Sequence, residues 1–254
     1  MTFAEYRAIE AMNWSSLKLM DNPRLYQWRQ EHPQPERAAL SLGSAVHCAV
    51  LEPDDFDARY VIRPEGIDLR TKAGRAWRSD VCNGRSMVSE TVALCRDSVM
   101  ANPEARELVE SATTEQTATW TDTTGVECKA RLDALCTNEF SDIKTTSKPL
   151  DQFEREVARH MYHGQIAFYG DGAHAAGMTS STLASYIIAV ETVEPYDCAV
   201  FRLPPHIVEA GRRLYRSFLD NWLTCRETGL WPGRYPGMNW LDLPPWAPGM
   251  ESES

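Results

Sequence analysis

The residues best suited to chemistry in this sequence are Asp133 and the triplet Asp142-Ile143-Lys144. In a β-strand, side chains two residues apart share a face, so Asp142 and Lys144 lie side by side and Ile143 points the other way. Two aspartates on adjacent strands can converge on one divalent cation, because hard cations such as Mg²⁺ prefer oxygen ligands. A lysine next to that cation could stabilise a hydroxide or a phosphate. This combination is suited to metal-assisted hydrolysis of a phosphodiester.

Strands have to position these side chains. The segment from Thr117 to Leu135 is rich in β-branched and alternating residues, and Asp122-Thr-Thr-Gly125 has the composition of a turn. We therefore expect a hairpin, followed by a third strand that carries the triplet. Period two places Lys129 and Arg131 on the same face of the second strand as Asp133.

An Asp-x-Lys triplet on a strand is more often an exposed charge pair than part of a site. Two further features favour a site. Glu115 precedes the hairpin, and Gln165 and Tyr169 follow the strands at a spacing of one helical turn. On the helix expected from His163 to Ala176, these two side chains would share a face and could reach a phosphate or orient a ligand.

The order of these motifs resembles that of the PD-(D/E)XK nuclease superfamily, in particular its RecB-like branch. Two upstream segments, Leu51–Phe56 and Leu69–Gly74, are similar to RecE-type exonucleases (exonuclease VIII-like), and the resemblance runs from about Met12 to Trp246. The residues that carry it are Leu42-Gly-Ser-Ala-Val-His47, Glu115, Asp133, Asp142-Ile143-Lys144 and Gln165-x-x-x-Tyr169.

The resemblance implies an α/β fold with a PD-(D/E)XK nuclease core, in which helices flank a central mixed β-sheet. It implies that Asp133 and Asp142 bind Mg²⁺ or Mn²⁺, with the Ile143 carbonyl as a further ligand. It places His47 near or on the metal. Glu115 would join a second metal or position water. A lone histidine on an apolar helix is otherwise most often a core residue.

Catalysis and DNA binding would involve further residues. By the same resemblance, Lys144 would stabilise or orient the nucleophilic hydroxide, and Gln165 and Tyr169 would bind the DNA backbone. The family relationship implies processive 5′-to-3′ digestion of one strand of duplex DNA from a free end. The resulting 3′ overhang would serve a single-strand annealing recombinase, commonly in phage or prophage recombination.

Two other functions stay open. The same core supports structure-specific endonucleases and single-strand exonucleases, since a fold does not determine a function. A catalytically decayed DNA-binding module is the second alternative. It is disfavoured because the two acids and the lysine are all present.

The net charge of −10 is unusual for a protein that binds DNA, because cationic side chains drive binding to phosphates. The charge is unevenly distributed, however. Residues 63–85 hold six basic and three acidic residues, and a second basic stretch spans Arg202 to Arg216. Solvated helix faces would explain both stretches equally well. We expect the first stretch to line the DNA entrance through Arg70, Lys72, Arg75 and Arg78.

The seven cysteines contain no Cys-x-x-Cys pair, which argues against a zinc site and a disulfide framework. Some RecB-like nucleases carry an iron–sulfur cluster on closely spaced cysteines after the Gln-x-x-x-Tyr helix. Only Cys198 and Cys225 follow it here, so no cluster is expected. Without a leader or a membrane-length apolar run, we expect a cytoplasmic protein that does not enter a membrane.

We expect one nuclease domain over residues 1–254, with a helical part at about 1–111, the catalytic sheet and helices at about 112–230, and an irregular tail rich in tryptophan and proline at 231–254. Processive digestion suggests a closed ring of three or four subunits, and Trp231, Trp240 and Trp246 offer aromatic surface for subunit contacts. The expected helices are Leu40–Leu51, Lys72–Cys82, Ser89–Met100, Pro103–Ser111, Leu150–Met161, His163–Ala176 and Pro205–Thr228. The expected strands are Tyr60–Arg63, Thr117–Thr121, Val126–Leu135, the triplet strand, Ala184–Glu191 and Cys198–Leu203.

Overall fold

The computed structural model describes residues 1–32, 42–179, 183–244 and 247–248. Two of the expectations above, for Leu40 and for Trp246, lie outside these residues. Within them, the helices are α1 (Phe3–Ala8), α2 (Trp14–Leu17), α3 (Pro23–Glu31), α4 (Leu42–Leu51), α5 (Pro53–Arg59), α6 (Lys72–Cys82), α7 (Thr91–Ala101), α8 (Pro103–Glu110), α9 (Phe153–His160), α10 (Tyr162–Ala175) and α11 (Pro205–Thr228). Two short 3₁₀-helices are η1 (Lys18–Asp21) and η2 (Leu150–Gln152).

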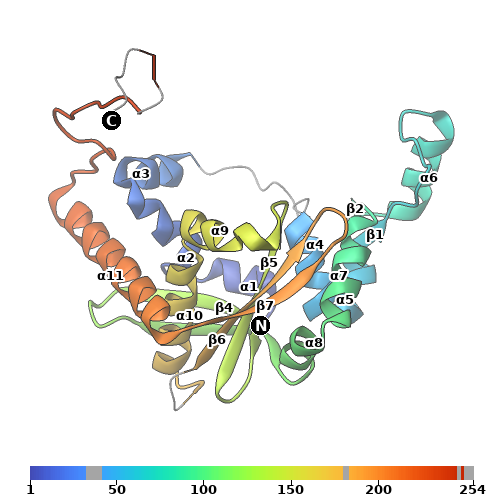
Figure 1. Cartoon of the computed structure of the whole chain (residues 1–254), viewed down its shortest axis with the longest axis horizontal. Coiled ribbons are helices and arrows are strands. Elements are labelled where there is room, and N and C mark those ends of the chain that lie inside the picture. The colour runs from blue at the N-terminus through green and yellow to red at the C-terminus, as the bar shows by residue number, and fades with distance from the viewer. Residues whose placement is uncertain (33–41, 180–182, 245–246, 249–254) are drawn as a thin grey trace.

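Five strands form the central sheet, in the order β3 (Thr113–Thr121), β4 (Glu127–Leu135), β5 (Glu139–Thr146), β6 (Ala184–Glu191) and β7 (Cys198–Leu203). The β5–β6 pair is parallel and the other three pairs are antiparallel. The sheet is therefore mixed, and helices cover both of its faces (Figure 1). The expected α/β fold, with a central mixed sheet flanked by helices, is confirmed.

The β3–β4 hairpin forms for the local reasons visible in the sequence. The Asp122 carboxylate accepts a hydrogen bond from the backbone N–H of Thr124 at 2.9 Å, which closes the turn. Gly125 follows with a φ of +82°, a conformation that glycine adopts without steric cost.

Each face of the sheet has its own hydrophobic core. On one face, α10 and α11 pack on the sheet through side chains such as Phe168 and Leu219. On the other face, α4, α7 and α8 pack against Ile143 and Ile188. The parallel β5–β6 pair requires a crossover connection, and η2, α9 and α10 supply it.

Strands β4 and β5 pair only briefly and then separate. Their register consists of Ala134 with Ser141 and Leu135 with Phe140. At the start of β4, where β5 is no longer paired with it, Met12 takes the position of a neighbouring strand. The Met12 N–H donates to the Glu127 carbonyl, and the Met12 carbonyl accepts from the Lys129 N–H, both at 2.8 Å. The N-terminal segment is thus built into the sheet beside the point where the two strands diverge.

The structure differs from the expected elements in several places. The expected helix Leu150–Met161 is divided into η2 and α9. A turn is the expectation at Pro53–Phe56, but Pro53–Arg59 is the helix α5, because proline suits the first helical position and Arg59 forms ion pairs with Glu52 and Asp55. The short strand β1 (Tyr60–Ile62) pairs in parallel with β2 (Ser86–Val88), which the sequence pattern did not reveal.

The helix α6 projects at one end of the molecule, beyond β1 and β2 and away from the central sheet (Figure 1). Among the described residues, no helix combines the length and the apolar character that crossing a membrane requires.

Candidate active site

Asp133 lies in β4 beside the point where this strand leaves β5. Its carboxylate is buried, and Oδ2 accepts a hydrogen bond from the backbone N–H of Ile143 at 2.8 Å. The side chain therefore replaces the backbone carbonyl that a continuous strand ladder would supply. Burial raises the pKa of the Asp133 carboxyl to about 6, while His47 acts to lower it and the charge of Asp142 adds to the rise.

His47 approaches Asp133 from α4 and contacts two oxygen atoms. Its Nδ1 lies 3.3 Å from Asp133 Oδ2, and its Nε2 lies 2.7 Å from the Ile143 carbonyl oxygen. A neutral imidazole carries one ring proton and can donate to only one of them. The other oxygen then faces a ring lone pair and receives no hydrogen bond from the ring. The Ile143 carbonyl, expected to be a metal ligand, contacts His47 in this arrangement.

Glu115 completes a group of potential ligands. It interrupts β3 with a φ of +55°, which is uncommon for a residue with a side chain. Ligand atoms of His47, Glu115 and Asp133 all lie within 4.8 Å of one another. Arg131 Nε also donates a hydrogen bond to the Glu115 carboxylate and so orients it. Two carboxylates and an imidazole at this separation fit one divalent cation such as Mg²⁺ or Mn²⁺.

Asp142 and Lys144 form a second group in β5. Asp142 is only 1% exposed; its Oδ1 accepts a hydrogen bond from Gln165 Nε2 at 3.1 Å, and its Oδ2 forms an ion pair with Lys144. The Lys144 ammonium also lies 4.9 Å from the centre of the Tyr162 ring. Burial tends to lower the pKa of Lys144, but the charges of Asp142 and Asp133 outweigh it, so this pKa lies above its usual value. Lys144 is therefore held as a cation.

Asp142 does not belong to the group formed by His47, Glu115 and Asp133. Its Oδ2 is buried and has no hydrogen-bond partner besides the Lys144 ammonium within the described chain. The structure thus brings all the predicted metal residues into one region, but it divides them into a ligand group and an acid–lysine pair.

Gln165 and Tyr169 reach this region from α10. Gln165 positions Asp142 through the hydrogen bond described above. Burial raises the pKa of the Tyr169 hydroxyl well above its usual value, and the nearby charges of Asp142 and Asp133 add to the effect. Tyr169 is therefore a neutral hydroxyl beside the two aspartates.

The structure does not bring the predicted DNA-binding cations of the first basic stretch to these carboxylates. They lie on α6 and on the loop before it, within the projection described above (Figure 1). Arg70 is 91% exposed and pairs with Asp68 at 2.9 Å. Four cations of the first basic stretch thus form a separate exposed surface: Arg70, Lys72, Arg75 and Arg78.

The second basic stretch is largely occupied by structural ion pairs. Arg212 pairs with Asp171 at 2.7 Å, which links α11 to α10. Arg216 pairs with Asp122 at 2.7 Å, which links α11 to the β3–β4 turn. These two arginines already have carboxylate partners that hold α11 in place.

Sequence reasoning missed two residues that shape the region. Arg131 was expected on the Asp133 face, but no role was assigned to it, and it pairs with Glu115. Tyr162 lies directly under the Lys144 ammonium at the start of α10. Period two was a usable signal for Arg131, whereas no local pattern marks Tyr162.

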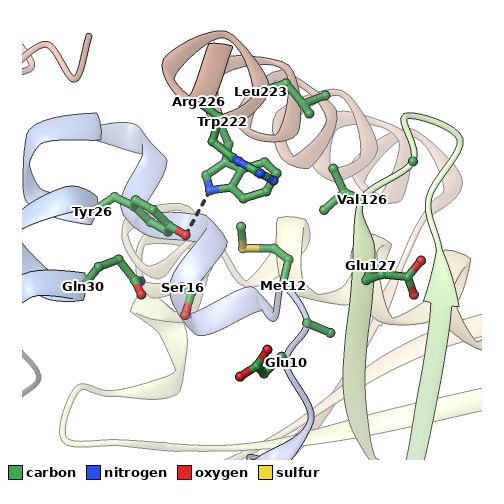
Figure 2. A pocket seen from close by; sticks show the side chains of 12 residues that line it. Glu10, Met12, Ser16, Tyr26, Gln30, Val126, Glu127, Trp222, Leu223 and Arg226 are labelled. Carbon is green, nitrogen blue, oxygen red and sulfur yellow. Dashed lines mark hydrogen bonds between the residues drawn. The ribbon is translucent and has the colours of Figure 1, made fainter. Parts of the chain in front are cut away.

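A pocket of about 410 Å³ lies between the N-terminal segment, α3, α11 and the β3–β4 turn (Figure 2). Trp222 Nε1 donates a hydrogen bond to the Tyr26 hydroxyl at 2.9 Å on one side, and Met12 and Arg226 also line it. None of the predicted site residues lines this pocket.

The family profile described as "PDDEXK-like domain of unknown function (DUF3799)" matches residues 17–242 of this chain. No curated protein sequence matches this chain.

Among solved structures, the chain is similar to a crystal structure described as "Putative exonuclease" from Eubacterium rectale. The TM-score is 0.62 at 12% sequence identity, and the match covers 96% of this chain and 95% of the other. At this identity, the likeness concerns the fold.

Proposed function

This chain belongs to the family of PDDEXK-like domains, and on that premise we propose that it is a metal-dependent DNA exonuclease of RecE type. The family places it among the PD-(D/E)XK nucleases, which use divalent metal ions. The observation that carries the proposal is the convergence of His47, Glu115 and Asp133 beside the pair of Asp142 and Lys144.

His47, Glu115 and Asp133 would hold the cation, and Asp142, paired with Lys144 in the same region, would be a further ligand. A bound Mg²⁺ or Mn²⁺ polarises a phosphate oxygen and lowers the pKa of bound water. Arg131 keeps the Glu115 carboxylate oriented for this role.

The remaining groups act on substrate and water. Lys144 stays protonated and lies between Asp142 and the Tyr162 ring, so its ammonium can orient an attacking hydroxide and offset the negative charge that develops on the phosphate. Gln165 fixes the Asp142 carboxylate. Tyr169, as a neutral hydroxyl, can donate a hydrogen bond to the nucleic-acid backbone.

Metal affinity should depend on pH through Asp133. Ligand carboxylates must lose their protons, and the pKa of Asp133 is raised to about 6, so affinity for Mn²⁺ should fall below about pH 6 and level off above it. The stability of the metal-free protein should change with pH in the opposite direction. Because the pKa of Asp133 is raised, its carboxyl contributes stability at low pH, and this contribution is lost as pH rises through about 6. Calorimetric titration of Mn²⁺ across this range measures the first effect. A flat profile would show that Asp133 is not a ligand.

The direction and extent of digestion rest on the family resemblance alone. We propose digestion of one strand of linear duplex DNA, 5′ to 3′ and processively, which would leave 3′ overhangs for a single-strand annealing recombinase. An end-labelled linear duplex and a closed circular duplex, each with and without Mg²⁺, test this proposal. We expect Mg²⁺-dependent release of short products from the linear duplex only. Cutting of the closed circle would instead indicate an endonuclease.

The exposed cations of α6 should contact DNA outside the hydrolytic region. Replacing Arg75 and Arg78 together with glutamine should weaken binding, and should flatten its salt dependence by roughly one unit of slope for each phosphate that the protein no longer neutralises. Fluorescence anisotropy of a labelled duplex over a salt series measures the slope. Arg106→Gln, on the exposed side of α8, is the matched control. An unchanged slope in the double variant would make the α6 surface an ordinary solvated face.

We also propose a ring of three or four subunits around the DNA, since enclosure explains processivity without tight contacts. Support comes from the tail after α11, where Met238, Trp240 and Leu241 are almost fully exposed apolar side chains. Light scattering should then give three or four times 28.7 kDa. A monomer that digests processively would refute the ring.

A further inference from the structure

Lys18 is a half-buried cation for which neither the sequence motifs nor the hydrolytic mechanism above gives a role. It begins η1, directly after α2, so the helical backbone runs without a break from Trp14 to Lys18. Side chains four residues apart share one face of a helix, and Lys18 therefore lies one turn along the stripe that Trp14 begins.

Trp14 fixes the position of this stripe on α10. A Cβ atom at Gly164 would lie 2.4 Å from Trp14 Cη2, so the two helices approach at a distance that only glycine permits. Gly164 stands next to Gln165, which binds Asp142, and two residues after Tyr162. The contact therefore anchors α2 at the end of α10 that faces the hydrolytic residues.

At the same end of α10, the Tyr162 ring lies 4.9 Å from the Lys144 ammonium of β5. Burial lowers the pKa of Lys18, and the positive charge of Lys144 lowers it further, so the two ammonium groups interact electrostatically. Within the described residues, Lys144 pairs with Asp142, whereas Lys18 has no carboxylate partner.

Two neighbouring cations of which only one has a carboxylate partner repel each other, and the repulsion is strongest where water is partly excluded. A phosphate anion between them would relieve this repulsion, and a lysine binds phosphate through a charge-assisted hydrogen bond. We propose that Lys18 binds an internal phosphodiester of the DNA, the one adjacent to the phosphodiester that is cut. The inference rests on the proposed nuclease function and adds a residue from the N-terminal segment to its substrate site.

The main variant is Lys18→Met, which keeps an unbranched stem for packing and removes the charge. Binding is measured by anisotropy of a labelled duplex in Ca²⁺, under conditions in which no cleavage is detected. We expect Kd to rise roughly tenfold, the scale of one charge-assisted hydrogen bond, and the salt slope to fall by about one unit. Lys18→Arg should restore most of the affinity, and Arg106→Gln should leave it unchanged.

Steady-state digestion gives an independent readout. Because Lys18 would bind the substrate outside the bond that is cut, KM should rise while kcat stays within about twofold. The effect should be equal on duplexes with a 5′ phosphate and with a 5′ hydroxyl. A loss confined to the 5′-phosphorylated duplex would overturn the assignment to an internal phosphodiester.

The two levels of the proposal fail in different ways. If the wild-type protein neither binds DNA nor cleaves it in Mg²⁺, the nuclease function fails. If the wild type does both, and a Lys18→Met variant with an unchanged melting temperature matches it in Kd, salt slope and KM, then only the role of Lys18 is refuted.

Discussion

Replacing Asp142 with asparagine should lower Mg²⁺-dependent DNA hydrolysis by roughly 10³-fold or more, the scale on which enzymes lose rate when a preorganised charge is removed. Asp142 is almost fully buried, accepts a hydrogen bond from Gln165 and pairs with Lys144. Its carboxylate would help to hold the cation, and it fixes the ammonium that would assist the attack. The substitution therefore removes a metal contact and the partner of Lys144 at once. Single-turnover digestion of an end-labelled duplex measures the loss.

A loss of stability must be separated from this loss of chemistry. Asparagine keeps the volume and an oxygen acceptor for Gln165, but it leaves the Lys144 ammonium buried without a partner, which costs about 3 kcal/mol or more. The double variant Asp142→Asn with Lys144→Met removes both charges and should recover much of the melting temperature without recovering activity. Glu104→Gln, at an exposed acid on α8, is the control for charge. Near-normal digestion by Asp142→Asn would exclude Asp142 from the active site.

The hairpin and the order of the site residues could be predicted because local patterns encode them. The Asp122 turn closes through its own side chain. Alternation along β4 puts Ala130 and Leu132 on the face opposite Asp133, and both lie in the core. The same alternation predicts Asp142 beside Lys144, as the structure has them. Period two and turn chemistry act over a few residues, so the sequence displays them directly.

The divergence of β4 and β5 could not be predicted in this way. It depends on Met12, more than a hundred positions away, taking the place of a strand against Cys128. Regular alternation also breaks near Asp133. Leu132 and Ala134 would share a face in a regular strand, but Leu132 lies in the hydrophobic core on the α10 side of the sheet and Ala134 in the core on the α4 side. Such features arise from contacts between distant segments, for which a local period carries no signal.

The position of the basic residues shows the same limit. Their composition identified a cationic surface, but only the fold shows that α6 projects away from the sheet (Figure 1). Composition gave no indication of a role for Lys18, since it is a single lysine in a helical segment. The DNA-binding role proposed for it depends on the contact between Trp14 and Gly164, which only the fold shows.

Replacing Lys144 with methionine should slow hydrolysis by roughly 10²- to 10⁴-fold, the range expected when a group that assists proton transfer or charge development is lost. Metal binding should survive, because Lys144 is not a ligand. At high pH it should even strengthen, since a cation next to the ligand group is removed. The Lys144 charge also lowers the pKa of Asp133, so the pH at which metal binding is half lost should move upward in this variant.

Calorimetric titration of Mn²⁺ at several pH values, together with single-turnover digestion, tests both parts of this expectation. Lys144→Arg is the matched variant: it keeps the charge but presents a planar guanidinium, so it should preserve the pH profile of metal binding while restoring activity only in part. The opposite result, lost metal affinity with unchanged chemistry, would show that the roles of Lys144 and the aspartates are wrongly assigned. Because the ammonium is fixed between Asp142 and the Tyr162 ring, its effect on rate should depend on position as well as on charge.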